Sequence, residues 1–178
     1  MTIYEARQRE HYEKIVDFLE KQPKESFAFQ CMAKEIGEFF TDEQIEFLKE
    51  QKRFLHLFIC EDDEKEVRVV GGFERRGFDP KLDEPKISTF ILLSVSEDDL
   101  RKKEIKYFRE LLDYLARYAY DEWGIEKSEN WVPENLIEFV RELFGDSMEI
   151  IREGSSDLGW WKGKWYFIVV DVRKYLGV

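Results

Sequence analysis

The stretch from Ile87 to Trp123 constrains the fold more than any other part of the chain. Its first part, Ile87–Val95, is an apolar run rich in β-branched and aromatic residues, which predicts a buried strand. After a polar turn, apolar residues recur at spacings of three and four and predict a helix of about 24 residues, roughly 36 Å long: Ile105, Phe108, Leu111, Leu112, Leu115 and Ala119. Because α/β proteins bind ligands where such a helix begins, we expect any cofactor site at this junction.

Length and charge restrict the class of protein. The chain has 178 residues, so we expect a single domain over residues 1–178. A formal net charge of −11 argues against nucleic acid as a partner, since phosphate binding needs a cationic surface. The two cysteines make no disulfide framework, and no apolar window approaches the length of a membrane span, so we expect a cytoplasmic protein that does not bind membranes. The charged fraction of 38%, with Asn only at Asn130 and Asn135, favours a thermophilic source.

The rest of the chain predicts strands and helices that form one sheet. The expected strands are Thr2–Ala6, Phe54–Cys60, Glu66–Glu74, Glu129–Val132, Met148–Arg152 and Lys164–Arg173. The expected helices are His11–Glu20, Cys31–Phe40 with a further turn after Thr41, and one opened by Pro133 and capped by Gly145. A loop is expected over Glu153–Gly159, and the almost wholly apolar last strand is expected to be central. The fold class is therefore α/β (α+β), a mixed, mostly antiparallel twisted sheet with helices on both faces.

Several residue patterns leave alternatives open. Gly71 and Gly72 inside a strand indicate a bulge or a close backbone approach. His56 in an apolar strand is a satisfied core residue or a ligand, and Cys60 reads as a small buried hydrophobe. With two histidines and two scattered cysteines, we expect no metal site. The run Arg101–Lys103 is either a solvated charge run or an anion site. We favour the anion site, because cations at the start of a helix oppose its dipole and are unfavourable there unless an anion binds.

Aromatic residues gather in two further places. Phe27 and Phe29 precede the expected helix at Cys31–Phe40, and this region either covers a sheet face or lines a substrate cleft. Near the C-terminus, aromatic side chains form either core and a hairpin corner, which we favour, or a binding platform: Trp160, Trp161, Trp165 and Tyr166.

The order of elements and five groups of residues resemble the GNAT acyltransferase superfamily. The matching segments are Ile3–Arg7 with Ile15–Val16, Ile59–Asp63 with Val69–Phe73, Leu93–Ser96 with Arg101–Lys106, Asn135–Gly145, and Val170–Leu176. Leu93–Ser96 and Arg101–Lys106 occupy the place of the family's acetyl-CoA motif, in which a strand ending Leu-x-Val precedes an Arg-x-x-Gly-x-Gly loop.

The resemblance implies an acyl-CoA-dependent N-acyltransferase of the GNAT fold. Acetyl-CoA or CoA would then be bound by the strand end and the cationic turn, at Leu93, Val95, Arg101, Lys102, Lys103 and Lys106. The implied partner is a small-molecule or peptide amine that accepts the acyl group. An exposed edge of the closing strand would also allow two chains to pair as a homodimer.

The chain departs from the family pattern at positions that carry chemistry. Glu104 and Lys106 stand where the motif has glycines, so a carboxylate occupies a helix start that should receive phosphate. Arg141 stands where many members have a catalytic tyrosine, which leaves the general acid unidentified. Glu74 or Glu97 would have to serve as the base. The alternatives are a catalytically inactive GNAT-like domain acting as a binding or assembly module, and a CoA-free sensor of small ligands that uses the aromatic cleft.

Overall fold

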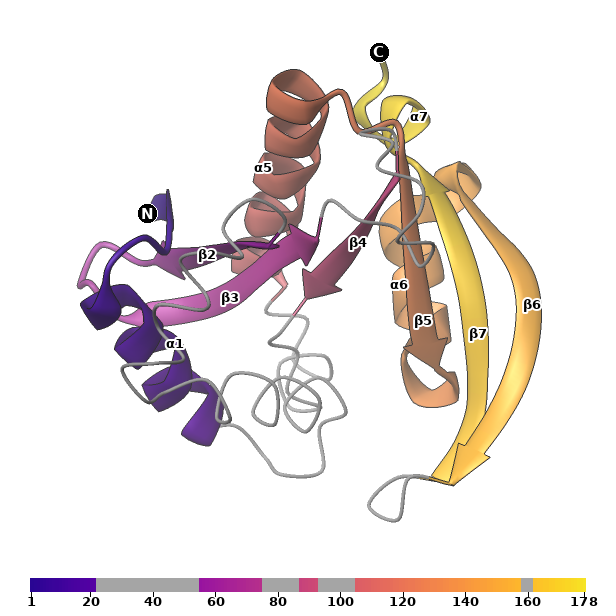
Figure 1. The fold of residues 1–178 in the computed structure, drawn as a ribbon, viewed down its shortest axis with the longest axis horizontal. Helices are drawn as coiled ribbons and strands as arrows, with labels where there is room; N and C mark the ends of the chain where they lie inside the picture. Colours follow the sequence, from indigo (N-terminus) through magenta and orange to yellow (C-terminus); the bar gives the residue numbers. More distant parts are fainter. Residues whose placement is uncertain (22–54, 75–86, 93–104, 158–161) are drawn as a thin grey trace. The chain divides into compact units, whose positions relative to one another are not determined.

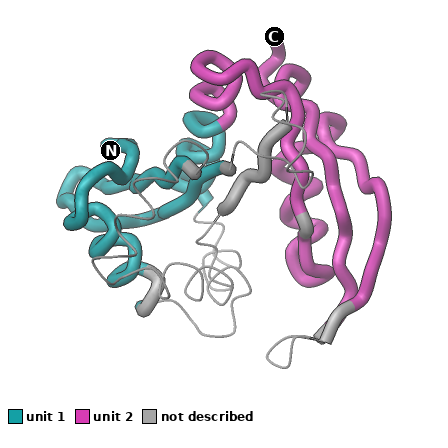
Figure 2. Tube along the Cα trace, in the orientation of Figure 1, with its two compact units in different colours: residues 1–74, 91–115 teal, residues 75–90, 116–178 magenta. Residues whose placement is uncertain are grey.

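The computed structural model describes residues 1–21, 55–74, 87–92, 105–157 and 162–178 (Figure 1). These residues form two compact units, residues 1–74 with 91–115 and residues 75–90 with 116–178 (Figure 2). The helix expected at Cys31–Phe40, the turn after Thr41 and the aromatic residues before them lie outside the described residues. The single domain over residues 1–178 stays a prediction. Among the helices that are described, none is both long and apolar enough to span a bilayer.

The first unit is built on three antiparallel strands. They are β1 (Thr2–Glu5), β2 (Leu55–Glu61) and β3 (Val67–Glu74), and β2 pairs with both of the others. The helix α1 (Arg9–Glu20) follows β1. Between β2 and β3 the carboxylate of Asp62 accepts the backbone N–H groups of Glu64 and Glu66, which closes the predicted hairpin turn.

Two helices cover opposite faces of this three-stranded sheet. Tyr4 lies opposite Ile59 in the register, and its hydroxyl contacts Lys14 of α1. The neighbouring Phe58 must point to the other face, where its ring lies 5.6 Å from that of Tyr114 in α5 (Lys106–Trp123). The apolar residues that the helical period predicted are buried: Ile15, Phe108, Leu111, Leu112 and Leu115.

Gly72 allows β2 and β3 to approach each other closely. It lies opposite Leu57 in a continuous part of the register. A Cβ atom at this position would lie 2.1 Å from the backbone oxygen of His56, far inside van der Waals contact. The close-approach alternative is therefore confirmed for Gly72, because no side chain larger than hydrogen fits there. The register shift in this pair falls instead between Cys60 and Glu61.

Helix α5 is shorter than the sequence period indicates. It begins at Lys106, and the preceding Ile105 is not helical, so the described helix has 18 residues. Its end at Trp123 agrees with the prediction: Gly124 has φ 64° and donates its N–H to the carbonyl of Tyr120. Lys106 is therefore the first residue of α5, and the cationic residues Arg101–Lys103 lie outside the described residues.

The second unit holds the C-terminal strands. β5 (Lys127–Pro133) pairs antiparallel with β7 (Lys162–Asp171), which pairs antiparallel with β6 (Met148–Asp157) on its other side. The prediction that the last apolar strand is central is confirmed for this unit. The start of β4 (Ile87–Leu92) pairs parallel with β5. Every described pairing except β4–β5 is antiparallel, so the mixed, mostly antiparallel α+β class is confirmed.

The predicted ends of β6 and β7 were wrong. The loop expected from Glu153 is strand as far as Asp157, because these residues pair with the start of β7. The last strand ends at Asp171, whose carboxylate accepts the N–H of Lys174 and caps the short helix α7 (Val172–Leu176).

Pro133 also lies outside the helix that it was expected to open. It ends β5 in an extended conformation, φ −69° and ψ 154°, before the 3-10 turn η1 (Glu134–Leu136) and helix α6 (Ile137–Phe144). The Gly145 cap is confirmed, since its N–H donates to the carbonyl of Arg141. A second 3-10 turn, η2 (Gly145–Ser147), leads into β6.

Candidate functional site

The first turn of α5 carries the one predicted cofactor-binding residue that the structure describes. Lys106 is exposed, and its Nζ lies 6.0 Å from the ring centroid of Tyr107. The guanidinium of Arg68 on β3 lies 5.2 Å from the same ring. The first turn of α5 contains no acidic residue. Arg68 and Lys106 therefore both lie beside one tyrosine ring at the amino end of α5, and cations at a helix amino terminus suit a phosphate group.

Arg68 was missed by the sequence reasoning. It lies 38 positions before Lys106 along the chain, in a strand whose alternation says nothing about its distance from α5. Its guanidinium is 3.7 Å from the carboxylate of Asp62, and 43% of its side chain is exposed, so it is accessible to a ligand. The other predicted cofactor-binding residues lie outside the described residues: Leu93, Val95, Arg101, Lys102 and Lys103.

The parallel pairing of β4 with β5 is short. In the described part of the chain it joins Ile87 to Lys127 and Ser88 to Ser128. Beyond Ser128, β5 continues as far as Pro133 in unbroken register with β7.

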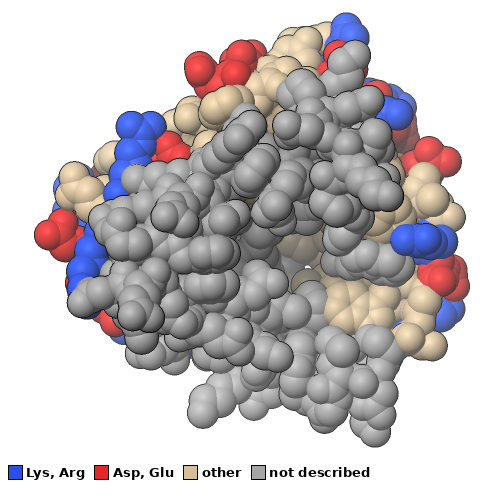
Figure 3. All heavy atoms as spheres, in the orientation of Figure 1, with Lys and Arg blue, Asp and Glu red and all other residues tan. Residues whose placement is uncertain are grey.

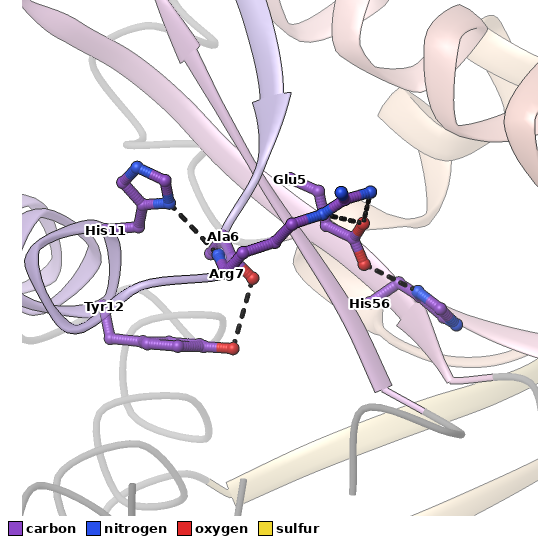
Figure 4. Close-up of polar contacts among 6 residues, drawn as sticks. All are labelled: Glu5, Ala6, Arg7, His11, Tyr12 and His56. Carbon is purple, nitrogen blue, oxygen red and sulfur yellow. Dashed lines mark hydrogen bonds and ion pairs between the residues drawn. The ribbon is translucent and has the colours of Figure 1, made fainter. Parts of the chain in front are cut away.

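A polar network fixes the end of β1 against β2. The carboxylate of Glu5 lies 2.8 Å from Nδ1 of His56 through one oxygen, and the other oxygen accepts two bonds from the guanidinium of Arg7 (Figure 4). Burial raises the pKa of Glu5, but the hydrogen bonds of His56 and Arg7 lower it by more, so that it lies below its usual 4.5. The ionised carboxylate therefore accepts, and Nδ1 of His56 donates.

Two further hydrogen bonds join the residues after β1 to α1. The backbone N–H of Arg7 donates to Nδ1 of His11, and the hydroxyl of Tyr12 donates to the carbonyl of Ala6 (Figure 4). His56 is only 5% exposed and stacks on Phe73 with a centroid distance of 4.9 Å. His56 is thus a buried core residue with a hydrogen-bond partner at Nδ1, and these contacts join β1, β2 and α1.

A second hydrogen-bonded carboxylate, which is buried, lies on the α1 face of the sheet. Glu61 accepts hydrogen bonds from the hydroxyl of Tyr4 at 2.7 Å and from Nζ of Lys14 at 2.6 Å. Burial raises the pKa of Glu61, but the hydrogen bonds from Lys14 and Tyr4 lower it by more, so that it lies below its usual 4.5. The hydrogen bond to Glu61 in turn raises the pKa of Lys14.

Acid is expected to lower the free energy of unfolding as the pH falls below about 4.5. Glu5 and Glu61 have lowered pKa values in the folded state, so the unfolded chain takes up protons first. Their stabilisation is complete above the unfolded pKa and is lost as the pH falls through the folded pKa. The free energy of unfolding, measured with urea, should fall less from pH 7 to pH 3 in Glu5→Gln/Glu61→Gln than in the wild type. Glu13→Gln, on the exposed side of α1, is the control and should behave as the wild type. Equal losses in all three proteins would contradict this assignment.

Cys60 behaves as the buried hydrophobe that the sequence indicated. It is 0% exposed, and burial raises the pKa of its thiol to about 11, so the reactive thiolate is not populated near neutral pH. In the described residues, no group of three or more His, Cys, Asp or Glu side chains could hold a metal ion. On the face drawn in Figure 3, basic and acidic side chains of the described residues are interspersed.

Comparison with solved structures relates this arrangement to known proteins. The chain superposes on the protein smu.2055 from Streptococcus mutans with a TM-score of 0.64 at 13% identity, covering 97% of this chain and 99% of that one. A mutant of the spermidine N-acetyltransferase SpeG from Vibrio cholerae gives 0.66 at 13% identity, covering 99% and 98%. A protein designated a phosphinothricin N-acetyltransferase gives 0.63 at 13% identity, covering 96% and 98%.

The chain has the GNAT fold. The predicted resemblance is confirmed at this level, since the matches cover nearly the whole of each chain. No protein-family model matches the sequence, and no curated protein matches it. At identities of 13%, the similarity establishes the fold alone.

The structure describes some of the residues that were expected to take part in catalysis or binding, and others lie outside the described residues. Arg141, at the place of the family's tyrosine, lies on α6 with its guanidinium 2.8 Å from Glu138, and 49% of its side chain is exposed. Glu97 and Glu104 lie outside the described residues, as does the side chain of Glu74. Trp165 is 9% exposed, which supports the core reading for this residue. Trp160 and Trp161 are outside the described residues.

Proposed function

We propose that the protein is an acyl-CoA-dependent N-acyltransferase that transfers an acetyl group from acetyl-CoA to an amine. The GNAT fold carries this proposal, and the two cations beside Tyr107 at the start of α5 support it. The thioester carbonyl would accept a hydrogen bond from a backbone N–H near Val95, at the end of the expected strand Ile87–Val95. The phosphates would lie at the start of α5, near Lys106 and Arg68.

The proposal includes the residues that the structure does not describe. Leu93 and Val95 would flank the thioester, and Arg101, Lys102 and Lys103 would pair with phosphate oxygens beside Lys106. The acceptor would be a small-molecule or peptide amine; one structural neighbour is a spermidine N-acetyltransferase. A cytoplasmic location, a thermophilic source and a homodimer belong to the same proposal.

Titration calorimetry with acetyl-CoA and CoA tests the proposal directly. The wild type is expected to bind both ligands, and native mass spectrometry is expected to show CoA retained during purification. If neither ligand binds at millimolar concentration, the proposal is wrong.

Removing both described cations at the α5 start is expected to weaken CoA binding about tenfold, or about 1.4 kcal/mol. The variant is Arg68→Ala/Lys106→Ala, and the loss should shrink at high salt because the contacts are electrostatic. Arg173→Ala, an exposed cation on α7, serves as control. Equal affinities of the double variant and the control would place the phosphates elsewhere.

The alternative function is a catalytically inactive GNAT-like binding or assembly module. Arg141 favours it, because this residue sits where the family's tyrosine acid is expected and is engaged in a surface ion pair with Glu138. This alternative predicts that no amine is acetylated even when acetyl-CoA binds. An assay of thiol release with a panel of amines separates the two functions.

A further inference from the structure

The side chain of His11 joins the start of α1 to the chain that leaves β1. His11 is the third residue of α1, and its Nδ1 lies 3.1 Å from the backbone nitrogen of Arg7 (Figure 4). A side chain in the third helical position that accepts a backbone N–H from just before the helix resembles a capping box. Glu or Gln usually supplies the acceptor in that motif, whereas here a histidine supplies it.

This hydrogen bond requires the neutral form of His11. A backbone nitrogen can only donate, so Nδ1 must carry a lone pair, and the one proton of the neutral ring is on Nε2. A second proton can bind only at Nδ1, where it would face the N–H of Arg7 and remove the acceptor. Histidine is the type of side chain that ordinarily changes its charge between pH 5 and 8. A capping box built on Glu or Gln would keep its acceptor over this range.

The charge of protonated His11 acts in the same direction as the loss of the hydrogen bond. A cation in the first turn of α1 opposes the helix dipole, which favours anions there. Glu10 is the acidic residue of this turn. Further along α1, the carboxylate of Glu13 lies 3.0 Å from the guanidinium of Arg9, so it is already paired.

The groups that face His11 from β1 and β2 are also paired with one another. The ring of His11 meets the ring of Tyr4 edge-on, with 5.1 Å between centroids. The hydroxyl of Tyr4 donates to Glu61 at 2.7 Å and accepts from Nζ of Lys14 at 3.2 Å. Nζ of Lys14 also donates to Glu61 at 2.6 Å. The carboxylate of Glu61 is thus engaged by Lys14, and protonated His11 would add a second cation beside Tyr4.

The chain on the strand side of the His11 bond is fixed by other groups. The N–H of Ala6 donates to the carbonyl of Leu57 on β2 at 2.8 Å, and the carbonyl of Ala6 accepts the hydroxyl of Tyr12 at 3.2 Å. Neither bond depends on the protonation of a histidine. Loss of the His11 bond therefore frees Arg7 and the first turn of α1, and leaves Ala6 in place.

We propose that protonation of His11 releases the first turn of α1 from the end of β1, so that this junction is a pH-sensitive switch. At pH 7.5 the neutral ring accepts the N–H of Arg7 and stabilises the junction. As the pH falls to 5, this stabilisation is lost. The inference does not depend on the proposed acyl transfer, and its test uses no CoA.

The experiment measures hydrogen exchange of the Arg7 amide by NMR in the full chain, corrected for the intrinsic effect of pH on exchange. In the wild type, protection of this amide is expected to fall about tenfold from pH 7.5 to pH 5. His11→Gln keeps an acceptor that does not titrate, so its protection should change less than about twofold. The melting temperature should fall about 3 °C more in the wild type than in His11→Gln over the same range. His56 and its partner Glu5 are the same in both proteins, so the difference reports His11.

The outcomes decide the inference in either direction. It is overturned if protection of Arg7 in the wild type is the same at both pH values, or if His11→Gln loses as much protection as the wild type. If His11→Gln is itself less stable than the wild type at pH 7.5, His11→Ala takes its place. Its Arg7 amide should be weakly protected at both pH values, and a wild-type pH dependence in His11→Ala would overturn the inference.

Discussion

Replacing Gly72 with alanine is expected to lower the free energy of unfolding by about 3 kcal/mol or more. The added Cβ would lie 2.1 Å from the carbonyl oxygen of His56, which is backbone and cannot rotate away. β2 and β3 would have to separate along their shared register, with loss of interstrand hydrogen bonds on both sides of the clash. Urea unfolding followed by circular dichroism measures the effect.

Gly124→Ala provides the matched control for this substitution. Gly124 has φ 64°, and a Cβ there would meet nothing within 4 Å, so the cost is conformational alone, about 1 kcal/mol. If Gly72→Ala and Gly124→Ala had equal free energies of unfolding, β2 and β3 would tolerate a side chain at position 72. The close approach would then be contradicted.

Replacing His56 with alanine is expected to cost about 3 kcal/mol. The change removes a ring that stacks on Phe73 and a donor 2.8 Å from the carboxylate of Glu5. His56 is 5% exposed, so the space left behind is not freely filled by solvent. Glu5 would retain Arg7, whose side chain is 66% exposed.

His11→Ala is the corresponding control at the other histidine. His11 is half-buried and accepts one backbone N–H, from Arg7, so its removal is expected to cost about 1 kcal/mol. A double-mutant cycle with His56→Ala and Glu5→Gln isolates the pair, and we expect a coupling of about 1 kcal/mol or more. Additive losses would show that the two side chains stabilise the protein independently.

The sequence predicted most element types correctly because their signals are local. The period of Leu111, Leu112 and Leu115 predicts a helix wherever the helix lies, and the apolar run around Ile168 predicts a strand. The boundaries were wrong where pairing or capping overrode the local pattern. β6 extends past Glu153 because β7 pairs with it, and β7 stops at Asp171 because that side chain caps a helix.

The candidate sites also have features that the sequence could predict and features that it could not. The cationic character of the turn before α5 could be predicted from the sequence, since Lys106 sits within a run of charged residues. The sequence contained no signal that Arg68 lies on the same tyrosine ring as Lys106, or that Glu5 holds His56, because these pairs are 38 and 51 positions apart. Glu74 and Glu97 were named as base candidates because the expected strand Ile87–Val95 contains no glutamate, and solvated surface charges were the simpler interpretation of both.

By itself, the sequence determined the alternation of strands and helices, the buried faces and the resemblance to the GNAT superfamily. These depend on side-chain period and local propensity, which the order of residues contains directly. Only the tertiary structure decided which carboxylates accept hydrogen bonds from distant residues and why Gly72 must be glycine. Both depend on strand register, because a shift of one residue would move Gly72 away from the carbonyl of His56 and His56 to the other face of the sheet.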